Sequence, residues 1–256
     1  MSFNTANGYW AAEGRRTGQR KWPWFLAITA TTLLMVVVLW SLVSNETGEG
    51  CRAGIRGNRC HLENAPARVA RDHVMLPDKP YPYSKLLTPL RFRDSRGTLW
   101  TAPLATLTDG ASIPEIFVPL IGEPRSLEFL AAAALHDAYC GTGNEQLTQF
   151  RSRPWEETHR MLYDSLVSSG VPETKAKVMF AAVYLGGPRW DDPDRVLQGL
   201  PESRLRDLME LCIDFIKTEK PTRPEIEAWM HRHEKELLSD TQNPTGKKGV
   251  PSRYPL

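Results

Sequence analysis

The chain has 256 residues, of which 41% are hydrophobic and 24% charged, so it can bury a core over at least part of its length. The formal net charge is only +2. This balance excludes a chain that binds nucleic acid through a general excess of positive charge, and we expect no nucleic-acid partner.

An uncharged run at residues 23–43 has the length of a membrane-spanning helix, about 20 residues. Tryptophans stand near both ends of the run, as in the aromatic belts of membrane proteins. Just before it stand four basic residues and one acidic residue: Arg15, Arg16, Arg20, Lys21 and Glu13. By the positive-inside rule we expect a single-pass anchor in a bacterial inner membrane, with residues 1–22 cytoplasmic and the C-terminal domain periplasmic. A cleaved signal peptide is the alternative, although its apolar region is usually shorter, about 7–15 residues.

Residues 44–65 are rich in polar residues and glycine and have no apolar period, so they are predicted to be a linker. Within them, Cys51 and Cys60 bracket a short basic loop and are expected to form a local disulfide in an oxidising compartment. A zinc site is the alternative, but only His61 adjoins these cysteines and no tetrahedral set is complete. The other two cysteines are expected to be core or free thiols: Cys140 and Cys212.

An α+β core domain is predicted at residues 66–192. Its first part predicts four short strands, at residues 69–76, 86–92, 98–101 and 104–107. Pro89 suggests that the second strand lies at an edge, because proline donates no hydrogen bond to a neighbouring strand. The Asp-Ser-Arg-Gly sequence at residues 94–97 is typical of a hairpin turn between the second and third strands. We expect one small antiparallel sheet.

The rest of the chain is predicted to be helical. Five helices are predicted, at residues 126–139, 154–170, 172–186, 204–217 and 224–238. Ser126 is expected to cap the first, proline and glycine mark the ends of the first three, and the last two have mixed charged faces. The last two make up a C-terminal helical part at residues 193–239, and the polar, basic residues 240–256 are predicted to be a disordered tail. Strands followed by helices, without alternation, predict an α+β fold: a small antiparallel sheet packed against a helical bundle, with one N-terminal transmembrane helix.

The loop after the last predicted strand carries the first candidate residues. Asp109 follows the strand, and Gly110 permits the turn. Asp109 either caps this turn or acts as a catalytic base or ligand. Ser112 fits a helix-capping box better than a nucleophile, because the spaced glycines of a nucleophile elbow are missing.

His136 and Asp137 stand at the end of a helix that is apolar on all sides and is therefore expected to lie in the centre of the core. A carboxylate in the last turn is disfavoured by the helix dipole by about 0.3–1 kcal/mol. It therefore needs a compensating partner, which could be a metal, the neighbouring imidazole, Arg151 or Arg153.

His159 lies on an apolar face of the next helix, together with Trp155 and Leu162. This face is expected to pack on the central helix. A hydrogen-bonded core histidine is the simplest interpretation of His159. If it faces His136 and Asp137 instead, the three form a ligand set for zinc or another divalent metal. Asp109 and Asp137 are then the catalytic residues, with one carboxylate acting as general base on a metal-bound water.

Three sequence motifs resemble a known family. They are Leu-Thr-Asp-Gly-Ala-Ser-Ile-Pro at residues 107–114, His-Asp-Ala-Tyr at 136–139, and a Gly-Val step at 170–171 followed by a helix to Gly-Pro-Arg-Trp at 187–190. Together they resemble the domain of unknown function 1353 family, which occurs in phage and phage-derived bacterial proteins. The resemblance covers roughly residues 86–190 and implies that the loop and the helix end converge. The family usually has an aspartate where His159 stands here.

These features predict a membrane-anchored metal-dependent hydrolase that acts on the cell envelope, with a peptidoglycan-like polymer as substrate. The alternative is a non-enzymatic, phage-derived envelope or assembly module, whose partners would be envelope or phage proteins. In that alternative the same residues form a buried polar network.

Overall fold

The computed structural model describes residues 51, 60–77, 79–110, 113–121, 126–192 and 200–242. All of them belong to one compact unit, Glu49–Leu256. The predicted anchor at residues 23–43, most of the predicted linker, the predicted tail beyond residue 242 and Ser112 lie outside the described residues.

Within the part of the chain that the structure describes, no helix is both long and apolar enough to cross a membrane. By this finding the predicted location, a single-pass inner-membrane protein with a periplasmic domain, is wrong, and the transmembrane helix of the predicted fold class is without support. The longest described helices, α6 (Glu202–Glu219) and α7 (Arg223–Gln242), carry charged residues along their length. Such residues are costly in a hydrocarbon layer.

The strands of the described residues form two small antiparallel sheets, where the sequence predicted one. One sheet has the order β1-β4-β5 and the other β2-β3-β6. Their bounds are β1 (His61–Glu63), β2 (Val69–Val74), β3 (Tyr83–Leu86), β4 (Leu90–Arg93), β5 (Leu99–Ala102) and β6 (Leu107–Thr108). The α+β class is therefore confirmed.

The predicted strand at residues 86–92 is interrupted, and this break separates the two sheets. β3 ends at Leu86 and β4 begins at Leu90, with Pro89 between them. The amide of Leu87 donates to the carbonyl of Arg68, 2.7 Å away, whereas Pro89 has no amide hydrogen to give to a ladder. Pro89 therefore marks a change of sheet and not an edge strand, since β4 lies in the middle of its sheet.

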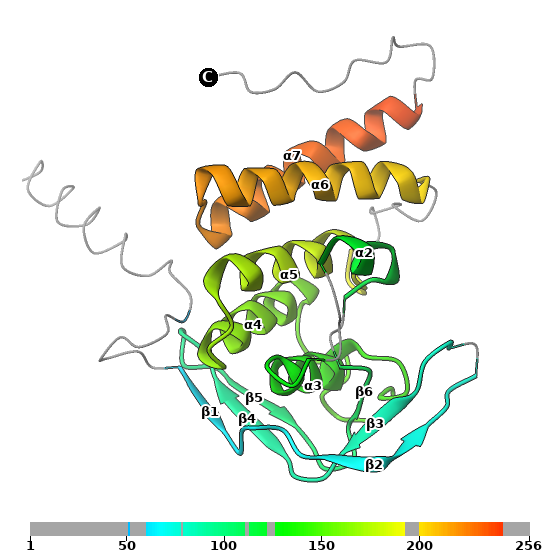
Figure 1. The fold of residues 1–256 in the computed structure, drawn as a ribbon, viewed down its shortest axis with the longest axis vertical. Coiled ribbons are helices and arrows are strands. Elements are labelled where there is room, and N and C mark those ends of the chain that lie inside the picture. Colours follow the sequence, from blue (N-terminus) through cyan, green and yellow to red (C-terminus); the bar gives the residue numbers. More distant parts are fainter. Residues whose placement is uncertain are drawn as a thin grey trace, which may run out of the picture. The chain divides into compact units, whose positions relative to one another are not determined.

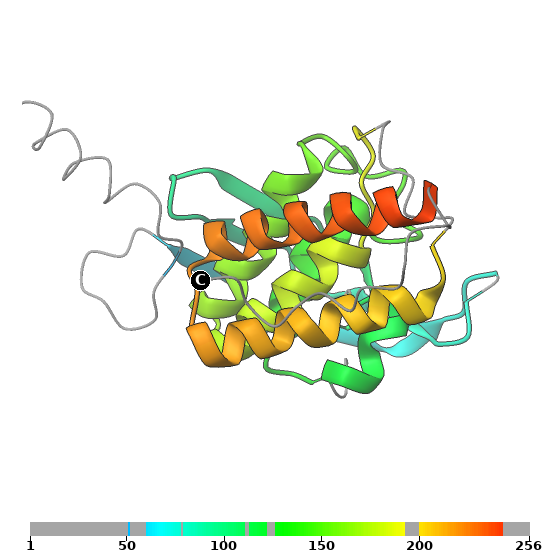
Figure 2. The ribbon, with the colours of Figure 1, turned by 90° about the horizontal axis from the view of Figure 1, so that it is seen from above.

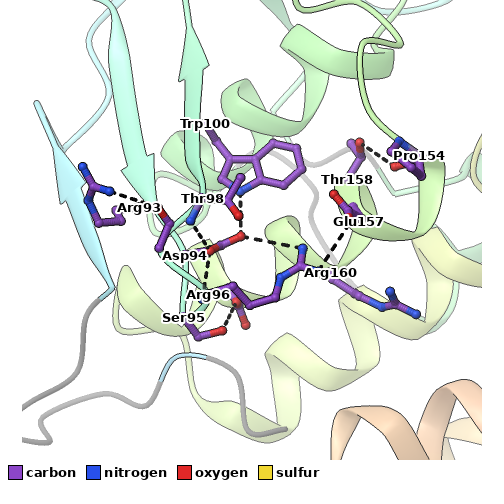
Figure 3. A network of polar contacts seen from close by, with 12 residues as sticks. Arg93, Asp94, Ser95, Arg96, Thr98, Trp100, Pro154, Glu157, Thr158 and Arg160 are labelled. Carbon is purple, nitrogen blue, oxygen red and sulfur yellow. Dashed lines mark hydrogen bonds and ion pairs between the residues drawn. The ribbon is translucent and has the colours of Figure 1, made fainter. Parts of the chain in front are cut away.

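The predicted hairpin at residues 94–97 is confirmed, and a buried aspartate builds its turn. β4 and β5 pair with Phe92 opposite Trp100. One carboxylate oxygen of Asp94 accepts the amides of Arg96 (3.0 Å) and Thr98 (2.8 Å). The other accepts the indole N–H of Trp100 at 2.9 Å (Figure 3). Asp94 therefore fixes both the turn and a large buried ring.

All five predicted long helices are present. The helices are η1 (Glu115–Phe117), α2 (Val118–Ile121), α3 (Leu130–Cys140), α4 (Trp155–Ser168), α5 (Glu173–Gly186), α6 and α7. The predicted start of α3 at Ser126 was too early, because the helix begins after Phe129 without a side-chain cap. The predicted stop at Gly141 is confirmed. A Cβ there would lie 2.7 Å from the Cβ of Asp137, so a larger residue does not fit without a shift.

Helix α3 lies between the strands and the other helices (Figure 1). Its Leu135 belongs to an apolar cluster with the strands, including Phe92 and Trp100. Its Ala132 belongs to a second cluster formed mainly by α4 to α7. Figures 1 and 2 show α6 and α7 side by side over α5, which contacts both. The expectation that α3 is central is confirmed.

The predicted disulfide between Cys51 and Cys60 is present. Cys51 is buried in the strand cluster, and its amide donates to a carboxylate oxygen of Asp164 in α4 at 3.2 Å. This hydrogen bond connects the segment before β1 to helix α4, and the disulfide connects the same segment to Cys60, directly before β1.

Reduction of this disulfide is expected to lower the free energy of unfolding by about 2 to 3 kcal/mol, because the unfolded chain regains the freedom of a short closed loop. Urea unfolding with and without a reductant measures the effect. The C51A/C60A double variant is the control, and reductant should leave its midpoint unchanged. An unchanged midpoint in the native chain would contradict the prediction.

Candidate functional site

The two predicted histidines meet inside the core, where α4 packs on α3. The Nε2 atom of His136 lies 2.9 Å from the Nδ1 atom of His159, and both side chains are almost fully buried. The expected packing of the His159 face on the central helix is thus confirmed. Burial lowers the pKa of His136 to about 3, so this imidazole is neutral at pH 7.

A backbone carbonyl determines where the imidazole protons lie. The Nε2 atom of His159 is 3.2 Å from the carbonyl oxygen of Pro188. Because a carbonyl only accepts, this nitrogen carries the proton. In the neutral form of His159 the Nδ1 atom is then an acceptor. His136 then donates from Nε2. The sulfur of Cys140 lies 3.4 Å from this nitrogen and 3.6 Å from the bare Nδ1.

This geometry does not suit the predicted metal set of His136, Asp137 and His159. The facing nitrogens of the histidines hydrogen-bond to each other across 2.9 Å. Two imidazole ligands of tetrahedral zinc would instead point at the ion, with their nitrogens about 3.3 Å apart. Within the described ranges, no group of three or more His, Cys, Asp or Glu residues is arranged to hold a metal ion. No chemical step below is therefore assigned to a metal.

The charges of the two predicted carboxylates act on the same tyrosine hydroxyl. Asp109, directly after β6, is half-buried, and Asp137 in the last turn of α3 is 5% exposed. The pKa of Tyr83 is raised, first by burial and then by the charges of Asp109 and Asp137. Burial, Asp137 and Asp109 also raise the pKa of the Cys140 thiol, against the opposing charge of Arg151. The loop and the helix end therefore converge.

A buried asparagine, which the sequence did not single out, holds the two segments together. The amide group of Asn144 donates to the carbonyls of Leu107 (2.8 Å) and Asp137 (3.0 Å). Its oxygen accepts the amide of Leu107 at 2.9 Å. Asn144 thereby ties the first residue of β6, two residues before Asp109, to the carbonyl end of α3.

The arginines that were considered as partners of Asp137 each lie over an aromatic ring. The guanidinium of Arg153 is 4.9 Å from the ring centre of Trp100, and that of Arg151 is 5.0 Å from the ring centre of Phe150. Arg151 is nevertheless close enough to lower the pKa of Cys140. The site thus contains two carboxylates of unequal exposure beside a tyrosine hydroxyl, a thiol and a guanidinium. Such a set can donate and accept protons.

The fold and site define a small α+β domain with a polar centre at the end of a buried helix. Residues 84–183 match the model of the family described as "Protein of unknown function (DUF1353)". This part of the chain is therefore a DUF1353 family domain, and the predicted resemblance is confirmed at the level of the family. All four predicted site residues lie within the match: Asp109, His136, Asp137 and His159.

Two relatives come from Sinorhizobium fredii (strain NBRC 101917 / NGR234). "Uncharacterized protein y4iH" is 42% identical over 97 residues, which cover 38% of this chain and 37% of the relative. "Uncharacterized protein y4jT" is 37% identical over 121 residues, covering 47% of this chain and 34% of the relative. The chain therefore spans about a third of the length of either relative. No solved structure matches. The family description and these names state no activity, and the predicted phage association is without support.

Proposed function

We propose that the domain is a hydrolase in which Asp109 and Asp137 form an acid–base pair. The observation that supports this most directly is that Asn144 bonds both to Leu107, two residues before Asp109, and to the carbonyl of Asp137, so the segments that carry the two carboxylates meet. Both carboxylates also raise the pKa of Tyr83. Paired carboxylates in different environments are a common way to provide an acid and a base at the same pH.

The two carboxylates differ in ways that suggest different roles. Asp137 is buried at the carbonyl end of α3, where negative charge is disfavoured, so it is the better proton donor. Asp109 is half-buried and is the better base, positioned to activate a water. The Tyr83 hydroxyl would orient the bond that is cleaved. No part of this scheme requires His136 or His159 to touch the substrate.

A glycosidic bond of a cell-wall polymer is the substrate class to test first. Two carboxylates, one acting as acid and the other as base or nucleophile, are the usual catalytic groups for glycoside hydrolysis. The expected export of the domain no longer supports an envelope substrate, so the chemistry of the pair alone supports this choice.

Replacing Asp109 with asparagine is expected to lower turnover by about 10²- to 10⁴-fold, because the base is lost while the shape of the side chain is kept. The free energy of unfolding should change by less than about 1 kcal/mol, since Asp109 is only half-buried. The measurement is the release of reducing ends from purified cell-wall glycan by the full chain.

The exposed carboxylate of Glu145, in the loop that follows α3, provides a matched control. E145Q should hydrolyse the glycan at the native rate. The proposal is contradicted if the native chain releases no reducing ends from this or any other glycan tested, or if D109N retains full turnover.

A non-enzymatic assembly module is the second candidate, and the buried polar contacts favour it. His136, His159 and Asn144 are all buried and hydrogen-bonded within the domain, as expected of groups that specify a fold. Under this alternative, Asp137→Ala mainly lowers the melting temperature. Under the hydrolase proposal, D109N abolishes turnover with the fold intact, so the two functions give different results.

A further inference from the structure

A continuous series of buried contacts leads from the C-terminal helix α7 to the histidine pair. Helix α7 lies outside the region that matches the family. Glu234 of α7 contacts Arg189, and Arg189 follows Pro188 in the chain. The carbonyl of Pro188 accepts a hydrogen bond from the Nε2 atom of His159.

The contact between α7 and Arg189 is a two-pronged ion pair with little water around it. The Nη2 and Nη1 atoms of Arg189 lie 2.6 and 3.2 Å from the two carboxylate oxygens of Glu234. The side chains are 3% and 7% exposed, respectively. A second carboxylate, that of Asp192, lies farther away, 3.8 Å from Nη1, and is 29% exposed. Because a buried guanidinium is strongly destabilised when it loses its buried carboxylate, Glu234 is the main partner that holds Arg189.

Arg189 is also packed against the core. Its guanidinium carbon lies 4.0 Å from the ring centre of Trp155 and 5.1 Å from that of Tyr184. Its Nη2 atom donates to the carbonyl of Tyr184 at 2.6 Å. The side chain is therefore held between α4, α5 and α7.

The backbone around Pro188 has little freedom. The amide of Gly187 bonds to the carbonyl of Val183, and a Cβ at Gly187 would lie 2.3 Å from that oxygen. On the other side, the indole of Trp190 donates to the carbonyl of Arg153 at 2.9 Å. With Arg189 anchored between these two contacts, the Pro188 carbonyl is held against His159.

We infer that α7, through Glu234 and Arg189, fixes the proton arrangement of the His136–His159 pair. One acceptor, the Pro188 carbonyl, sets the tautomer of His159 and, through it, that of His136. Arg189 is thus a positioning residue that acts through the backbone next to it. This inference goes beyond the proposed hydrolase and is independent of whether Asp109 and Asp137 are catalytic.

Side-chain nitrogen spectra of the ¹⁵N-labelled full chain at pH 7 test this inference, because proton-bearing and bare imidazole nitrogens give separate signals. His136 and His159 are assigned with the H136Q and H159Q variants. In the native chain both histidines are expected to carry the proton on Nε2. A spectrum in which either Nε2 is bare overturns the inference without any further variant.

In E234Q the Nε2 proton of His159 is expected to exchange with water about tenfold faster, the size of change that the loss of one hydrogen bond produces. The other tautomer should also become visible. The matched control is E227Q, since Glu227 connects α7 to Arg160 of α4 and also pairs with Arg223 of its own helix. E227Q should leave the His159 signals as in the native chain.

Arg189→Lys provides a second variant that keeps the positive charge but loses the two-pronged bond, and the same change is expected in it. A folded E234Q or R189K with native His159 signals overturns the inference. Equal changes in E234Q and E227Q also overturn it, because they would reflect a general loosening of α7.

Discussion

Replacing Asp94 with alanine is expected to lower the free energy of unfolding by roughly 3 to 5 kcal/mol. The carboxylate accepts three hydrogen bonds, from Arg96, Thr98 and Trp100. The indole of Trp100 is fully buried, so its N–H would lose its acceptor without gaining water. A buried donor left without a partner costs about 1–3 kcal/mol, and bonds to a charged group are among the stronger ones.

Urea unfolding of the full chain measures this effect. Asp94→Asn keeps one acceptor oxygen and should fall between the native chain and D94A. Asp72→Ala removes an exposed carboxylate from β2 and should change the free energy by no more than about 0.5 kcal/mol. A loss of less than about 1 kcal/mol in D94A would show that water replaces the carboxylate in the turn.

Acidification is expected to destabilise the fold through His136. Burial lowers the pKa of this group from 6.5 to about 3, so between these values the unfolded chain binds a proton that the folded chain does not. The stability that comes from the neutral His136 is fully present above pH 6.5 and is lost as the pH falls toward 3. The free energy of unfolding falls by at most about 1.4 kcal/mol per pH unit through this group. At pH 5 it is about 2 kcal/mol lower than above pH 6.5.

A second buried group acts in the opposite direction. Burial raises the pKa of Asp164, so its protonation favours the folded state as the pH falls. The effect of His136 is therefore measured as the difference in pH slope between the native chain and H136N. H61N, which changes an exposed histidine of β1, should keep the native slope. Identical slopes in the native chain and H136N would refute the assignment.

The sequence predicted that the face carrying His159 packs on the helix that carries His136, because both residues lie on regular helices. The all-apolar sequence of α3 placed His136 in the core, and the spacing of Trp155, His159 and Leu162 placed His159 on the face that packs there. The hairpin was predictable for a similar reason, since Asp94 and Gly97 are typical turn residues. Periodicity and turn chemistry are local properties that can be read before the fold is known.

The remaining parts of the site have no such local signal. Asn144 stands in a polar loop and bonds to the backbone of two distant segments, which residue type alone does not reveal. The Pro188 carbonyl is a backbone group, so no side chain marks it. The metal hypothesis stays a prediction, because the sequence gives no distances and the same two histidines can face an ion or each other. Pro89 was read as an edge signal, although it ends one sheet and precedes the next.

Because α3 contributes residues to both apolar clusters, neither half of the domain has a complete core without it. Without α3, the buried side chains of the strands would lose the helix that covers them, and α4 would lose the helix against which it packs. The strand part and the helix part are therefore not expected to fold independently of each other. The family match is consistent with this, since it begins in β3 and continues through α3 into α5 without a break.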